Sequence, residues 1–171
     1  MTVTGGTKAA EWPLVRRRDD WLSLIVRRLA TTLSLPAVME VVARTARLMM
    51  HADGISLVLR DGDLCHYAEE DAIAPLWKGR RFPMSACISG WCMITGQAVS
   101  ISDIYEDERI PHDAYRPTFV RSLAMVPVPR NNPIAALGAY WAETYDASID
   151  DLELLQMIAD AAAPAIQQVR G

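Results

Sequence analysis

The chain has 171 residues, of which 51% are hydrophobic and 22% charged, and its formal net charge at pH 7 is −4. These values are ordinary for one globular domain and exclude a chain that is disordered over most of its length. No apolar run reaches the length of about 18 residues that a membrane span needs. The first ten residues also lack the apolar centre of a signal peptide. We therefore expect a cytoplasmic protein with no membrane partner.

The N-terminal third of the chain is predicted to be helical. Residues 1–13 are small and polar and predict a flexible segment, followed by a single domain over residues 14–171. Apolar residues at three- and four-residue spacing predict a helix over residues 14–33. A second helix is expected from Pro36, because proline is favoured in a first helical turn. The basic run 16–18 has no aromatic residues between its charges, so we expect it to face solvent and not nucleic acid.

The next segment changes from helical to strand periodicity. Residues 55–59 alternate between the two faces of a strand, and a return strand is expected over residues 64–68. Asp61-Gly62 between them predicts a two-residue hairpin turn, because both residue types tolerate positive φ.

Further elements are predicted in the second half of the chain. A short helix is expected around residues 90–94, and strands over residues 98–102, 122–129 and 134–142. Ser148 and Asp151 form an approximate capping box for a last helix, in which Pro164 predicts a kink. Hairpins imply an antiparallel sheet with helices packed on one face. The long irregular segments between the hairpins are where we expect function, because loops of that length rarely lack one.

A series of motifs follows along the second half of the chain: Ile88-Ser89-Gly90-Trp91, residues 95–103 from Thr95-Gly96-Gln97, Arg109, residues 120–128 and residues 133–141. In their order and spacing these motifs resemble the GAF family, and the resemblance covers about residues 21–169. It implies an α+β fold with a PAS-like antiparallel sheet of roughly five or six strands. N- and C-terminal helices would pack on one face of this sheet, and a small-molecule pocket would lie on the other face under the irregular middle segment.

The resemblance also implies a function. The modules that are most similar precede bacterial histidine kinases and diguanylate cyclases. The expected protein is therefore a regulatory sensor that binds an unknown small molecule and signals through its terminal helices to an output kinase or cyclase domain. It would have no catalytic residues and no metal. Apolar and amphipathic residues of the irregular segment are the candidate ligand-binding residues, although each of them could equally cap a second core: Phe82, Ile88, Trp91, Ile104, Tyr105, His112, Tyr115 and Phe119.

The number and positions of the three cysteines distinguish between subtypes of the family. Their odd number and the absence of a CxxC pair predict buried, reduced thiols without a disulfide. Bilin-binding members attach their chromophore to a cysteine before the central strand, and residues 108–119 have none. The Cys65-His66 pair lies instead in the first hairpin, so no covalent bilin is expected and the cofactor stays unknown.

Two alternatives from other classes remain open at this point. One is a thiol-based redox enzyme of the methionine sulfoxide reductase type, with Cys92 or Cys87 as the thiol. The other is a dimerisation module without a ligand.

We also expect a homodimer. Apolar residues lie on more than one side of the first and last helices, and a single sheet face cannot cover them all. Pairing of two copies about a two-fold axis would bury this surface. The residues expected at the interface are Trp21, Leu24, Leu154 and Met157.

Overall fold

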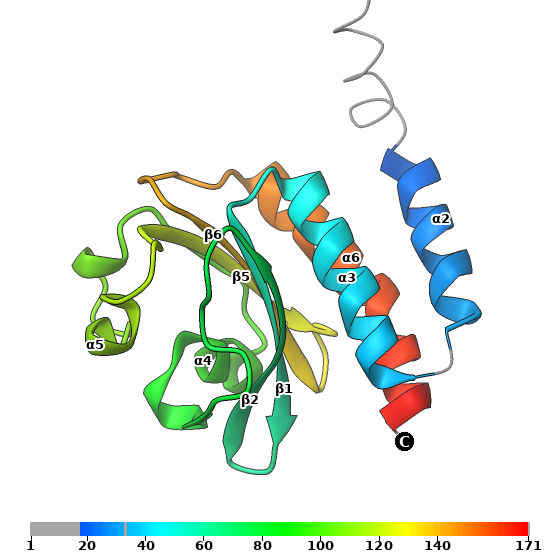
Figure 1. The fold of residues 1–171 in the computed structure, drawn as a ribbon, viewed down its shortest axis with the longest axis horizontal. Coiled ribbons are helices and arrows are strands. Elements are labelled where there is room, and N and C mark those ends of the chain that lie inside the picture. The colour runs from blue at the N-terminus through cyan, green and yellow to red at the C-terminus, as the bar shows by residue number, and fades with distance from the viewer. Residues whose placement is uncertain (1–17, 33, 171) are drawn as a thin grey trace, which may run out of the picture.

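The computed structural model describes residues 18–32 and 34–170, with the side chains of residues 18, 19, 21 and 170 left out. The predicted flexible segment and residues 14–17 of the first predicted helix lie outside the described residues. The described chain forms a six-stranded antiparallel sheet in the order β3-β2-β1-β6-β5-β4 (Figure 1). The strands are β1 (Gly54–Asp61), β2 (Leu64–Ala72), β3 (Arg81–Pro83), β4 (Val99–Ile101), β5 (Ser122–Val128) and β6 (Ala135–Trp141).

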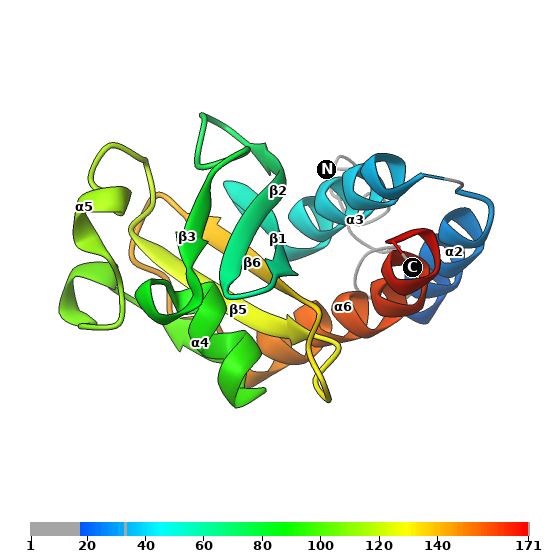
Figure 2. The same ribbon diagram turned by 90° about the horizontal axis from the view of Figure 1, so that it is seen from below.

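Three helices lie on one face of the sheet: α2 (Arg18–Ala30), α3 (Leu35–Met50) and α6 (Ile149–Arg170). The two helices α3 and α6 pack against strands, whereas α2 packs against α3 and α6 on their outer side (Figures 1 and 2). The predicted α+β fold, with terminal helices on one face of a six-stranded antiparallel sheet, is therefore confirmed.

Local sequence signals explain where the helices begin and end. The Ser34 hydroxyl accepts the backbone N–H of Ala37 at 3.3 Å and caps α3, and His51 ends that helix in a left-handed conformation. The predicted capping box of α6 is present: Asp151 N–H donates to Ser148 Oγ at 3.1 Å, and Ser148 N–H donates to an Asp151 carboxylate oxygen at 2.9 Å. The helix continues through Pro164 as far as Arg170.

The first hairpin forms as predicted, but its turn is one residue further along. Asp61 pairs with Leu64 in the ladder, so the two loop residues are Gly62 and Asp63, and Asp61-Gly62 was the wrong pair. Gly62 has φ of +59°, and Asp63 is not among the residues with positive φ. Glycine alone at the first loop position is the pattern of a type II′ turn, whereas the sequence rule assumed two positions of positive φ.

The opposite face of the sheet carries a layer that we term the roof, meaning residues 73–80, 84–98 and 102–121. It contains the short helices η1 (Met84–Ala86), α4 (Ile88–Thr95), η2 (Ile104–Glu106) and α5 (His112–Tyr115). Figure 2 shows α4 and α5 on the side of the sheet away from α3 and α6. The sheet thus has two buried cores, one under the helices and one under the roof.

Strand alternation decides which side chains enter each core. In β1, Ile55, Leu57 and Leu59 pack under the helices, while Val58 packs under the roof. In β6, Ala136 and Tyr140 belong to the roof-side core. Within the described ranges, no helix combines the length and apolarity required to cross a membrane.

Candidate functional site

Four aromatic side chains form the centre of the core under the roof. The Trp77 ring, in the roof, lies 5.4 Å from the Tyr67 ring, 4.6 Å from the Tyr115 ring and 5.5 Å from the Tyr140 ring, centroid to centroid. Its indole N–H donates to the carbonyl of Ala114 at 2.9 Å. Trp77 therefore joins strands β2 and β6 to α5, and the roof is fixed to the sheet by edge-on and tilted ring contacts.

Three buried hydroxyl groups in this region have no hydrogen-bond partner among the described residues. They belong to Ser56 on β1, Tyr115 on α5 and Tyr140 on β6, and each residue is at most 2% exposed. Ser56 lies near the Tyr140 phenol without reaching hydrogen-bond geometry. A buried polar group left unpaired costs about 1–3 kcal/mol. Three such groups on two central strands and the roof mark a place where a polar molecule would gain hydrogen bonds.

Burial also fixes the charge state of the tyrosines. Desolvation raises the pKa of Tyr67, Tyr115 and Tyr140 above the usual value, so all three phenols are neutral at physiological pH. A neutral phenol can both donate and accept a hydrogen bond. The unpaired hydroxyls therefore suit an uncharged polar ligand or a hydrogen-bond acceptor.

A second polar feature of the same core is a cluster of sulfur atoms. The Sγ atoms of Cys65 and Cys87 are 3.0 Å apart, and the Cys65 thiol donates to Met84 Sδ at 3.4 Å. The Ser89 hydroxyl donates to Cys87 Sγ at 3.3 Å and lies 3.1 Å from the Tyr67 hydroxyl. The cluster brings β2 together with η1 and the N-terminus of α4.

The two cysteines of the pair have opposite electrostatic environments. The contact with Cys65 lowers the pKa of Cys87 to about 6, helped by the Ser89 hydroxyl and by the backbone N–H groups of Ser89 and Gly90 at the start of α4. The contact with Cys87, followed by burial, raises the pKa of Cys65 above its usual value. Cys87 is thus the more acidic thiol of the pair, and Cys65, whose thiol donates to Met84 Sδ, is the less acidic one.

The third cysteine differs from both. Cys92 is fully buried in α4, and burial raises its pKa to about 12. A thiol with that pKa is almost entirely protonated at neutral pH and is a weak nucleophile. Burial therefore makes Cys92 less acidic than Cys87.

Gly90 allows α4 to lie against the preceding 3-10 helix. A Cβ atom at this position would lie 1.8 Å from the carbonyl oxygen of Met84. Only glycine permits this close approach of α4 to Met84, whose Sδ atom contacts Cys65.

The structure brings six of the eight predicted ligand-binding residues into the core under the roof. Ile88, Ile104 and Tyr115 are buried in it, and Phe82, Trp91 and Phe119 pack against it with partial exposure. Tyr105 and His112 lie outside this cluster, in the outer part of the roof.

His112 and Tyr105 organise the roof loop. His112 Nε2 lies 3.0 Å from the carbonyl oxygens of both Ile104 and Asp107, so this nitrogen carries the proton and donates. The Tyr105 ring packs against the His112 ring, with centroids 5.4 Å apart. In this arrangement His112 links η2 to α5, a loop-fixing contact that sequence reasoning did not foresee.

Ion pairs also stabilise the same loop of the roof. Arg109 forms an ion pair with Asp107 at 2.6 Å, and its guanidinium lies 4.5 Å from the Trp91 ring centroid. Arg121 pairs with Asp103 at 2.9 Å. The pKa of each carboxylate is lowered by the hydrogen bond from its arginine partner. Through its contact with Trp91, Arg109 thus attaches the loop to α4, the helix that contains Cys92.

Sequence reasoning missed the residues with the most unusual chemistry: Ser56, Cys65, Tyr67, Trp77, Ser89 and Tyr140. Cys65 and Tyr67 have the same strand phase, which signals a shared face. The contact between Cys65 and Cys87 joins segments 22 residues apart, and no local pattern predicts it.

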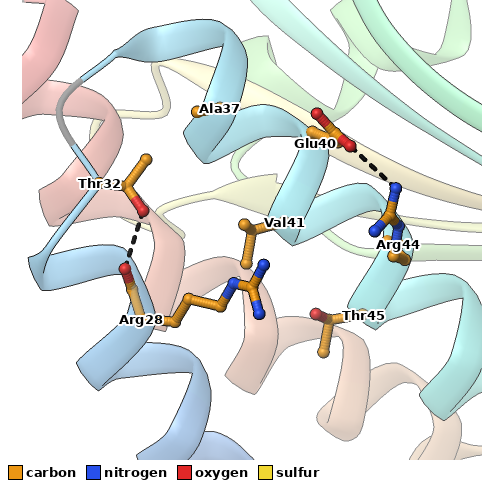
Figure 3. A pocket seen from close by; sticks show the side chains of 7 residues that line it. All are labelled: Arg28, Thr32, Ala37, Glu40, Val41, Arg44 and Thr45. Carbon is orange, nitrogen blue, oxygen red and sulfur yellow. Dashed lines mark hydrogen bonds and ion pairs between the residues drawn. The ribbon is translucent and has the colours of Figure 1, made fainter.

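The helical face carries a separate surface hollow of about 270 Å³ between α2 and α3. Figure 3 shows it lined by both helices, with Thr32 donating to the Arg28 carbonyl and Arg44 paired with Glu40 at 2.8 Å. Its charged groups largely satisfy one another, and it lies on the opposite side of the sheet from the roof. Across the described residues, no three His, Cys, Asp or Glu side chains are grouped as a metal ion would require.

The sequence over residues 32–167 matches the model of the GAF domain family. The chain belongs to this family. A search of curated proteins found no match.

Solved structures of the same fold come from several kinds of protein. The GAF domain of a phosphoenolpyruvate-protein phosphotransferase from Acinetobacter superposes with a TM-score of 0.78 at 17% identity, covering 91% of this chain and 96% of that one. A free methionine-R-sulfoxide reductase from Neisseria meningitidis, solved with its substrate, gives 0.76 at 18% identity, covering 90% of both chains. The chromophore-binding domain of a bacteriophytochrome from R. palustris gives 0.73 at 14% identity, covering 91% of this chain and 63% of that one. At these identities the likeness establishes the fold alone.

Proposed function

We propose that the protein is a regulatory sensor domain that binds a small polar molecule between the roof and the central strands. The observation that carries the proposal is the set of three buried, unpaired hydroxyls of Ser56, Tyr115 and Tyr140. A ligand that bridges them would hydrogen-bond to β1, β6 and α5 at once. Binding would therefore draw the roof against the sheet, which is the kind of differential contact a conformational signal requires.

The sheet is attached to both helices that would carry the signal onward. Arg47 on α3 forms an ion pair with Asp71 on β2 at 2.8 Å. Gln156 on α6 donates to the Pro127 carbonyl on β5 at 2.9 Å, and the Trp141 indole donates to the His51 carbonyl at 3.1 Å. A shift of the strands is thereby transmitted to α3 and α6. The proposed receiver is an output domain such as a histidine kinase or a diguanylate cyclase, in a cytoplasmic protein.

The test uses thermal unfolding with a panel of uncharged polar metabolites. A compound that binds is expected to raise the unfolding midpoint of the parent protein. The same compound should have no effect on a Tyr115→Phe, Tyr140→Phe variant, which keeps both rings and loses both hydroxyls. Tyr105→Phe is the matched control, because Tyr105 is 40% exposed and lies outside the cluster. Equal shifts in the parent and the double variant would contradict the proposed site.

The single variant Tyr140→Phe tests whether this hydroxyl is unpaired in the folded protein. In ligand-free protein, removal of an unpaired buried hydroxyl removes its desolvation cost, so Tyr140→Phe should stabilise the fold by about 1 kcal/mol. An increase in stability on removal of a polar group is expected where the group is kept for function and not for stability. A loss of stability of similar size in urea denaturation would mean that the hydroxyl is already paired.

A second candidate is a thiol-based reductase of the methionine sulfoxide reductase type. The low pKa of Cys87 and its contact with Cys65 favour it over a domain without reactive groups. Turnover of free methionine-R-sulfoxide with dithiothreitol separates the candidates, since a sensor shows none above a Cys87→Ser control.

A further inference from the structure

A chain of polar contacts ends at Cys87, and the proposed ligand site makes no use of it. The neutral Tyr67 phenol lies 3.1 Å from the Ser89 hydroxyl, and Ser89 donates to Cys87 Sγ at 3.3 Å. Cys65 Sγ is 3.0 Å from Cys87 Sγ on the same side of the core. An otherwise apolar core would accommodate aliphatic side chains at these positions without the cost of burying polar groups. The arrangement therefore points to thiol chemistry.

Access to the two sulfurs is unequal. Cys87 is 6% exposed, and it directly follows Ser85 and Ala86, which are exposed. Cys65 is fully buried behind it. A small oxidant therefore reaches Cys87 first, and Cys65 is protected until Cys87 has reacted.

We propose that Cys87 and Cys65 form a peroxide-reactive pair that closes reversibly into an intramolecular disulfide. Cys87 is the attacking thiolate, Cys65 is the resolving thiol, and the substrate is hydrogen peroxide. This inference is independent of the ligand proposed for Ser56, Tyr115 and Tyr140. The expectation of buried, reduced thiols agrees with the structure, in which all three cysteines are free and buried. The odd cysteine count that led to this expectation could not reveal the contact between Cys65 on β2 and Cys87 at the start of α4.

The reaction proceeds in two balanced steps. In the first, the Cys87 thiolate attacks one peroxide oxygen, an S–O bond forms and the O–O bond breaks, and the departing hydroxide takes up a proton to become water. In the second, Cys65 Sγ attacks the sulfenic sulfur of Cys87, an S–S bond forms, the S–O bond breaks, and hydroxide leaves with the Cys65 proton as water. In sum, two thiols and one hydrogen peroxide give one disulfide and two waters. A dithiol reductant reverses the change.

Local structure favours closure of the pair. An S–S bond is about 2.05 Å long, so the two sulfurs need to approach by about 1 Å. Side-chain rotation can supply such a movement, because β2 and the start of α4 are already packed against each other through Gly90 and Met84. The disulfide would then join β2, which is bonded to α3 through Asp71 and Arg47, to α4 of the roof.

The test is mass spectrometry of the reduced chain after treatment with hydrogen peroxide, with peptides mapped without reduction. The expected product has lost two hydrogen atoms and contains a peptide crosslinked between Cys65 and Cys87, and dithiothreitol restores the starting mass. Three free thiols after treatment, or a crosslink that involves Cys92, would overturn the proposal. This measurement needs no variant, so its outcome does not depend on whether a substitution folds.

Variants assign the two roles. Cys65→Ser should stop at Cys87 sulfenic acid, detected as a dimedone adduct, whereas Cys87→Ser should lose the peroxide reaction altogether. Cys92→Ser is the matched control and should crosslink as the parent does, and circular dichroism checks that each variant is folded. Peroxide reactivity that survives in Cys87→Ser would overturn the assignment of the attacking thiol. Because this experiment is done without a small-molecule ligand, its outcome does not depend on whether the proposed sensor site exists.

Discussion

Three cysteines with the same side chain acquire different chemistry from their neighbours. Cys92, within α4, is surrounded by apolar groups, whereas Cys87 precedes the helix and has N–H groups, a hydroxyl and a second thiol beside it. Sequence reasoning named Cys92 or Cys87 as a candidate reactive thiol and could not choose between them, because number and spacing carry no information on these contacts. It predicted Ile88, Ile104 and Tyr115 as ligand-binding residues, and the structure shows them buried in the core under the roof, so their contact with a ligand stays a prediction.

Alkylation of single cysteines as a function of pH tests this difference. The rate of reaction of Cys87 with iodoacetamide should rise with pH and reach half its maximum near pH 6, because only the thiolate reacts and its pKa is lowered to about 6. Cys92, with a pKa raised to about 12, should show no plateau below pH 9 or so. Peptide mapping by mass spectrometry follows both sites in one sample. A Cys87 profile centred near the usual thiol value of about 8.5 would contradict the assigned environment.

Gly90 has no room for a larger residue. Gly90→Ala would bring a methyl group against the Met84 backbone, where neither α4 nor η1 can move without disrupting the sulfur cluster. We expect the free energy of unfolding to fall by about 3 kcal/mol or more, at or beyond the upper end for overpacked cores. Urea denaturation monitored by circular dichroism measures the change. A loss below about 1 kcal/mol would show that α4 can shift away from η1.

At the scale of the element, periodicity and capping signals predicted most helices and strands, including the strands over residues 122–128 and 135–141. These signals succeed because strand alternation and helix caps act within a few residues. The same signals placed the turn after β1 one residue too early. They also did not predict β3, a strand of three residues that pairs with β2. Short strands of this kind depend on a partner distant in the chain.

The turn after β1 offers a matched comparison with Gly90. A Cβ atom at Gly62 would meet nothing within 4 Å, so only the positive φ of 59° opposes a side chain there. Gly62→Ala should therefore lower the free energy of unfolding by about 1 kcal/mol, the cost of a left-handed conformation for alanine. Denaturation in urea under the same conditions as for Gly90→Ala gives the ratio of the two effects. Equal losses at the two sites would refute the distinction between a steric and a conformational requirement.

At the scale of the whole molecule, the sheet separates the core under the roof from the core under the helices. The core between the sheet and the roof holds the unpaired hydroxyls and the cysteine pair, while α2, α3 and α6 cover the other face. Sequence resemblance was sufficient for this layering, because it depends on the order of the elements. The resemblance could not predict which side chains contact one another in the core under the roof, because these contacts join segments that are distant in the sequence.

The helical face retains apolar surface. On α2, Leu24 is 53% exposed and Val26 is 49% exposed, although Ile25 and Leu29 of the same helix are buried. A groove between α2 and α3 continues this surface, lined in part by Leu24 and Val41. Exposed apolar side chains that continue into a groove suit a contact with a partner surface.

We predict that this surface pairs two copies of the protein as a homodimer through α2 and α6. Leu24 is the most exposed of the predicted interface residues, while Leu154 and Met157 on α6 are half-buried. The Trp21 side chain lies outside the described residues. A two-fold axis would bury both copies of α2 against each other and bring the α6 helices of the two subunits together. Light scattering at tens of micromolar is expected to give the mass of two chains.

A charged substitution at the interface should separate the subunits. The variant Leu24→Glu, Met157→Glu places carboxylates in the apolar contact, where their desolvation is unfavourable, and should scatter as a monomer. Ile94→Glu is the matched control, because Ile94 is 61% exposed but lies on α4, on the opposite face of the sheet. That control should remain dimeric. A parent protein that is monomeric at this concentration would refute the dimer, and a dimer that tolerates both charges would refute this interface while leaving the association to another surface.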